Sequence, residues 1–220
     1  METKSFSLKR VNCTTLLIRK RNKQIFKIMK KLIAFSITCI LSFQFVLSQE
    51  IPSKDWQIKT ALMAVPQDYK DGAKVYGYNS AGEFTTLKEG NNDYIALASD
   101  PKRDRFSTAA YHKELESFMA RGRELRKQGK DGKEIFDIRE EEVKSGKLKM
   151  PDKATLCVFT GTVNEETKEI ENPYVRYVFY IPFATGESTG LPTTPTPPGH
   201  AWLMNPGTHR AHIMITPPKD

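Results

Sequence analysis

The alternation of apolar and polar residues predicts β-strands in two blocks of the chain, with a helical block between them. In the outer blocks, aromatic and β-branched residues recur in short runs that Gly, Asn and Pro interrupt, which is typical of strands and tight turns. The runs predicted as strands are 73–78, 83–88, 94–98, 154–160, 174–181 and 212–216. The first three are joined by short turns, so we expect them to form an antiparallel meander.

The middle block has the period of amphipathic helices. From Thr108 onward, apolar residues fall on one helical stripe, at Tyr111, Leu115, Phe118, Met119 and Leu125. A second helical run covers 133–144, and a shorter one ends before Pro66. Gly122 inside the first run allows another element to approach it closely. Together the patterns predict an α+β fold, with a mostly antiparallel sheet and a helical hairpin packed on one face.

Charge divides the chain near residue 48. The whole chain has a formal net charge of +8. Ten of its 34 Lys and Arg residues, but only one of its 26 Asp and Glu residues, lie in residues 1–48, so residues 49–220 hold 24 basic and 25 acidic residues. This near-neutral balance argues against nucleic acid as a partner, because binding to phosphates needs a basic surface.

Residues 29–48 have the order of a secretory signal peptide. Met29 and two lysines precede an apolar run of about 15 residues, shorter than the roughly 20 residues that span a bilayer. We predict cleavage near Ser48–Gln49, a single α+β domain over 49–220, and a periplasmic or extracellular protein. Such a protein meets a membrane only through its leader before cleavage. Residues 1–28 are then an extended n-region, or they lie upstream of a true start at Met29.

Most residues with site chemistry lie in the last fifth of the chain. His200, His209 and His212 are found there together with Glu187. Imidazole and carboxylate groups bind zinc, copper and nickel, so a metal-binding protein that uses the C-terminal histidines is one alternative. His209 and His212 are three residues apart, which places them on opposite faces of a strand unless the chain bends.

A hydrolytic enzyme is a second alternative, with His212 as general base beside Glu187. Ser188 stands in the sequence Gly-Glu-Ser-Thr-Gly at 186–190, which has the spacing of a nucleophile elbow. The elbow needs a helix after the serine, whereas Leu-Pro and the proline tract at 192–199 follow it. We therefore expect Ser188 to be a turn residue.

Binding without catalysis requires fewer features, and it is the leading hypothesis. Trp202, Tyr180 and Arg176 supply aromatic and cationic groups beside the proline tract, which we expect to lie as a strap across the surface. These three are the predicted ligand-binding residues of a non-catalytic ligand-binding or interaction module, and a small molecule is the expected ligand. The sequence identifies no cofactor.

Several segments of the chain carry a resemblance. They include Gly-Asn-Asn-Asp-Tyr-Ile at 90–95, the segments 111–116 and 118–126, Tyr-Ile-Pro-Phe-Ala-Thr-Gly-Glu-Ser-Thr-Gly-Leu at 180–191, and the segments 202–208 and 211–215. The chain resembles, over most of residues 54–216, a family of exported bacterial proteins of unknown function. The resemblance implies export, and it implies no activity, cofactor or catalytic residue.

Overall fold

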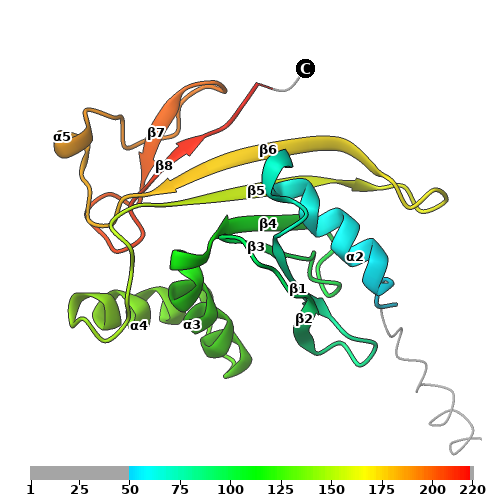
Figure 1. Ribbon diagram of the computed structural model, residues 1–220. Helices are drawn as coiled ribbons and strands as arrows, with labels where there is room; N and C mark the ends of the chain where they lie inside the picture. Colours follow the sequence, from blue (N-terminus) through cyan, green and yellow to red (C-terminus); the bar gives the residue numbers. More distant parts are fainter. Residues whose placement is uncertain (1–49, 219–220) are drawn as a thin grey trace, which may run out of the picture. The chain divides into compact units, whose positions relative to one another are not determined.

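The computed structural model describes residues 50–218, and within them eight strands form one sheet in the order β2-β1-β3-β4-β5-β6-β8-β7 (Figure 1). The strands are β1 (Lys74–Tyr78), β2 (Phe84–Lys88), β3 (Tyr94–Leu97), β4 (Ser107–His112), β5 (Ala154–Val163), β6 (Ile170–Tyr180), β7 (Ala201–Met204) and β8 (His212–Ile215). Neighbouring strands are antiparallel except β1 and β3. The predicted α+β class and its mostly antiparallel sheet are confirmed.

The helices of the described residues flank this sheet. They are α2 (Lys54–Ala61), α3 (Glu116–Lys127), α4 (Gly132–Lys144) and the single turn α5 (Gly186–Thr189), with 3₁₀ turns at Leu62–Ala64, Gln67–Tyr69 and Lys113–Leu115. A capping box starts α4, because Asp131 and Glu134 each bond the other's backbone N–H. The signal peptide predicted at 29–48 and the segment 1–28 lie outside the described residues.

The helices cover opposite faces of the sheet. Successive residues of a strand point to opposite faces, and Ala110 and Tyr111 of β4 accordingly belong to different core clusters. Ala110 lies in the cluster beneath α2, whereas Tyr111 packs with Phe118 of α3. Figure 1 shows α3 and α4 together on one side of the sheet and α2 on another part of it. The helical hairpin is thus one of two helical layers.

The predicted antiparallel meander of the first three strands is wrong. β3 does not continue beside β2 but lies parallel to β1, with Tyr76 opposite Leu97. The chain reaches that position by crossing the start of β1, where the backbone N–H of Asn91 donates to the Gly72 carbonyl at 2.8 Å. A Cβ at Gly90 would lie 2.3 Å from the Lys74 backbone nitrogen, so this crossing requires glycine.

The predicted start of a helix at Thr108 is also wrong. Residues Ser107–His112 form β4, which pairs with β5 so that Tyr111 stands opposite Leu156. Tyr111 is fully buried, and its hydroxyl donates to Glu116 at 2.5 Å. Helix α3 begins only at Glu116, because the strand pairing of Tyr111 with the central sheet outweighs its helical spacing.

The C-terminal segment contains one strand that the sequence analysis did not predict, β7. Its Leu203 is fully buried, and the Leu203 N–H donates to the Pro192 carbonyl at 2.8 Å, so the proline tract starts against β7. Ser188 lies in α5, where its hydroxyl forms a capping box with Thr185. The closing strand predicted at 212–216 is β8.

The buried amide of Gln57 yields a test of how α2 is fixed to the sheet. It donates to the carbonyls of Pro52 and Tyr78 at 2.8 and 2.9 Å, and it accepts from the Tyr78 N–H at 2.8 Å. Gln57→Leu leaves these backbone groups without partners, so we expect a loss of about 2 to 4 kcal/mol in the free energy of unfolding, measured in urea. Gln128→Leu, on the exposed end of α3, is the matched control and should change it by less than about 0.5 kcal/mol. Equal losses in the two variants would contradict this role of Gln57.

Candidate functional site

The structure separates the two residues of the hydrolase hypothesis. His212 lies on β8 with 4% of its surface exposed, and its Nδ1 lies 2.6 Å from the Arg210 carbonyl oxygen. Glu187 is exposed on α5. Among residues 50–218, no hydrogen bond or ion pair joins the two side chains. The geometry therefore provides no acid–base pair at these positions.

The three C-terminal histidines occupy three different environments. His200 is exposed in the turn before β7, and His209 is fully buried against α4. His212 is buried on β8, and its Nδ1 forms a hydrogen bond with the Arg210 carbonyl oxygen. Within the described part of the chain, no three His, Cys, Asp or Glu side chains are grouped so that they could hold a metal ion.

Trp202, Tyr180 and Arg176, the predicted ligand-binding residues, share one face of the sheet. Arg176, Val178 and Tyr180 lie on the same face of β6, two residues apart in turn. Val178 and Trp202 both stand opposite Met214 of β8, so Trp202 lies in the row between those of Arg176 and Tyr180. Tyr180 is only 6% exposed and meets the ring of Phe118 edge-on at 6.2 Å between centroids. Trp202 packs half-buried against the same core. Tyr180 and Trp202 are therefore largely core residues.

An arginine that the sequence analysis did not single out is buried in this region. Arg139 of α4 is 8% exposed, and its guanidinium carbon lies 4.0 Å from the ring centroid of Phe118. Its Nη1 donates to the Phe118 carbonyl at 3.2 Å, and its Nε is buried without an acceptor. A Cβ at Gly122 would lie 2.9 Å from that Nη1. The glycine in α3 thus makes room for the guanidinium, as its predicted role of close approach requires.

A second arginine, Arg210, enters the same region from the C-terminal segment. It is half-buried, its Nε has no hydrogen-bond partner, and its guanidinium lies 5.9 Å from the ring centroid of Phe136. Burial, followed by the charge of Arg210, lowers the pKa of Arg139 to about 10. Among residues 50–218, neither arginine forms an ion pair with a carboxylate. Both guanidinium groups therefore lack a counterion.

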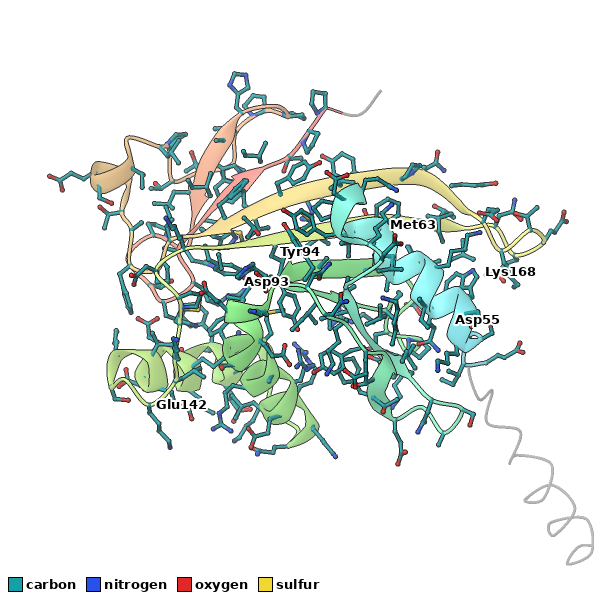
Figure 2. The ribbon with its side chains drawn as sticks, in the orientation of Figure 1. Asp55, Met63, Asp93, Tyr94, Glu142 and Lys168 are labelled. Atoms are coloured by element: carbon teal, nitrogen blue, oxygen red, sulfur yellow. The ribbon has the colours of Figure 1, made fainter. Side chains whose placement is uncertain are left out.

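The nearest carboxylates of α4 are paired with other cations. Glu142, labelled in Figure 2, accepts from Nε and Nη2 of Arg121, the shorter contact being 2.6 Å. Glu140 is paired with Lys144 at 2.8 Å and contacts His209. Glu142 attracts Arg139 at longer range, but neither acid forms an ion pair with Arg139 or Arg210.

The ring of His209 packs between α3 and α4. Its ring lies against Phe118 and Phe136 at 5.5 and 4.8 Å between centroids, and Nδ1 contacts the Glu140 carboxylate. Its backbone N–H donates to the same carboxylate at 2.8 Å, whereas Nε2 is buried without a partner. Burial lowers the pKa of His209, and this effect exceeds the opposing attraction of Glu140. A neutral ring that donates from Nδ1 to Glu140 fits these contacts.

Glu140 stays ionised in this setting. Burial opposes the ionised form, but the hydrogen bonds from Lys144 and His209 outweigh it and lower the pKa of Glu140 to about 2. Together Arg139, Arg210, Glu140 and His209 form a cluster where α4 meets residues 205–212, and we call it the α4 polar cluster. Its arrangement can hold a charged group, since within residues 50–218 Nε of Arg139 and Nε of Arg210 are N–H donors without an acceptor; Nε2 of the neutral His209 ring is an acceptor that also lacks a partner.

One sequence signal could have indicated the α4 polar cluster. The buried stripe of α4 consists of Ile135, Arg139 and Glu142, at helical spacing i, i+4 and i+7. Two charged residues on an apolar stripe, opposite a glycine inside α3, indicate a buried charge. The histidines drew attention instead because their side chains bind metals.

Comparison of the chain with protein-family models, curated proteins and solved structures finds no match. Within residues 50–218, none of the helices has the length and apolar character needed to cross a bilayer.

The buried histidines make the folding stability depend on pH. Burial lowers the pKa of His209 and of His212 below the 6.5 of an exposed imidazole, so the unfolded chain binds more protons than the folded chain between those values. Stability is then complete above about pH 6.5 and falls as the pH is lowered, by up to about 1.4 kcal/mol per pH unit for each histidine.

Chemical denaturation between pH 7.5 and pH 5 measures this dependence. His209→Asn keeps a donor toward Glu140 but cannot be protonated, so we expect a smaller pH slope in this variant. His200→Asn replaces an exposed histidine and serves as the control, with the slope of the unchanged protein. A slope that His209→Asn leaves unaltered would contradict the assignment of a neutral buried ring.

Proposed function

We propose that this protein is an exported, non-catalytic binding module, periplasmic or extracellular, with its ligand site in the α4 polar cluster. Its export is supported by the charge pattern and apolar run of residues 29–48 and by the resemblance to exported bacterial proteins. The cluster draws His209 and Arg210 from the C-terminal segment, and it does not include the predicted ligand-binding residues Trp202, Tyr180 and Arg176.

A single observation carries the proposal: among residues 50–218, Arg139 is buried without an ion-pair partner. Removing a guanidinium from water costs several kcal/mol unless a carboxylate or several hydrogen bonds compensate. Arg139 has one hydrogen bond and one aromatic ring, and its lowered pKa reflects the remaining cost. A residue that is unfavourable to the free protein is typical of a binding site, where a ligand supplies the missing interactions.

The other titratable groups of the region support binding over catalysis. Glu140 accepts a hydrogen bond from the backbone N–H of His209, and Nδ1 of His212 lies against the carbonyl oxygen of Arg210. The hydroxyl of Ser188 is used in the cap of α5. No observation on these residues favours the hydrolytic or the metal-binding alternative.

The proposal predicts that Arg139→Met stabilises the free protein. Methionine fills a similar volume without a buried charge, and the Phe118 carbonyl keeps the N–H of Gly122 as its helical partner. We expect a gain of about 1 kcal/mol, seen as a rise of roughly 2 to 4 °C in Tm by calorimetry.

Arg105→Met is the matched control. Arg105 is exposed in the loop before β4, so its replacement should change the unfolding free energy by less than about 0.5 kcal/mol. A fall in Tm for Arg139→Met would mean that Arg139 contributes to the stability of the free fold, and the proposed site would then be wrong.

A further inference from the structure

The α4 polar cluster concentrates the unsatisfied polar atoms of the described chain. Four buried side-chain nitrogen or oxygen atoms have no hydrogen-bond partner among residues 50–218, and three of them are Nε of Arg139, Nε2 of His209 and Nε of Arg210. Buried polar atoms without partners are rare in folded proteins. Three in one cluster therefore indicate that a group outside the chain completes the hydrogen bonding.

The charges of the cluster define the chemistry of that group. Arg121 is paired with both Glu124 and Glu142, and Lys144 is paired with Glu140. Arg139 and Arg210 form no ion pair among residues 50–218, although Glu142 attracts Arg139 at longer range. Arg210 lies close enough to Arg139 for its charge to lower the pKa of Arg139. Arginine binds phosphate and carboxylate oxygens through its planar fork of N–H donors.

On the basis of the proposed function, we infer that the α4 polar cluster binds a compact dianion, an oxyanion of the size of phosphate or sulfate. Two guanidinium groups match two negative charges, and the open Nε atoms offer donors from α4 and from the C-terminal segment. Arg210 is half-buried, so the cluster reaches solvent at this side chain. The chemistry is shared by inorganic phosphate and by a phosphate monoester.

His209 couples the same site to proton uptake. The groups that face its ring are Glu140 and Arg139 from α4, Arg210 from its own segment and the aromatic rings of Phe118 and Phe136. A dianion beside Nε2 offsets the two arginine charges and favours a protonated ring, whose Nε2–H then donates to the anion. Binding of sulfate, which keeps its charge from pH 8 to pH 6, becomes tighter as the pH falls.

Isothermal titration of the purified protein tests the inference with sulfate, inorganic phosphate, glycerol phosphate, succinate, acetate and chloride. We expect sulfate and phosphate to bind at least 10-fold more tightly than acetate or chloride. Tighter binding of glycerol phosphate than of phosphate assigns a monoester as the ligand, and the reverse order assigns the free ion. Tighter binding of succinate than of sulfate would overturn the compact form of the anion.

Variants locate the binding. Arg139→Met and Arg210→Met should each weaken sulfate binding by roughly 10- to 100-fold, as the loss of a charged hydrogen bond does. Arg105→Met, in the exposed loop before β4, should leave it unchanged. His209→Asn should remove the tightening of sulfate binding between pH 8 and pH 6. Equal weakening by all three arginine variants would overturn the inference, since it would reveal only non-specific attraction of an anion to the surface.

The two proposals fail in different ways. If Arg139→Met raises Tm but none of the anions binds, the dianion is refuted and the binding site remains. If Arg139→Met lowers Tm, the proposed function itself is refuted. Because Arg210 is half-buried, Arg210→Met keeps the anion test usable even if the Arg139 variant folds poorly.

Discussion

The carboxylate of Glu140 ties the C-terminal segment to the helical layer. It accepts from the backbone N–H of His209 at 2.8 Å and contacts the ring of the same residue, while Lys144 balances its charge. His209 lies three residues before β8, so this contact fixes where the segment turns into the sheet. β8 then runs between β6 and β7 and supplies partners to both. Without Glu140, a buried N–H and a fully buried ring would lose their partner, at a cost of several kcal/mol.

Helix α4 contains two buried charged residues, of which only one has an ion-pair partner among residues 50–218. Glu142 meets Arg121 in a forked pair, which is the arrangement that makes a buried charge tolerable. Arg139, one turn earlier, meets only a carbonyl and the ring of Phe118. A core under selection for stability alone would place an apolar residue there, as at Ile135. The difference between the two positions is the physical reason for placing a binding site at Arg139 and a structural role at Glu142.

Much of the fold follows from local patterns, because strands β5 and β6 and helix α4 each have an unambiguous period. The segment from Thr108 to Leu115 does not, since Tyr111 and Leu115 fit a helical stripe and Thr108 and Ala110 fit a strand equally well. Its state is decided by pairing with β5, a partner more than 40 residues away that no local pattern reveals. The parallel placement of β3 beside β1 depends likewise on a backbone crossing at Gly90.

The candidate site depends even more than the fold on contacts between distant segments of the chain. The sequence directed attention to the C-terminal segment because of its histidines, whose chemistry is recognisable in any context. The structure assigns His209 to a contact with Glu140, 69 positions away in the chain, and leaves its Nε2 buried without a partner among the described residues. The open nitrogen atoms come from α4 and from residues 205–212, and the room for Arg139 comes from a glycine in α3. A site assembled in this way from three distant segments has no sequence motif, because its residues form a site only when the fold brings them together.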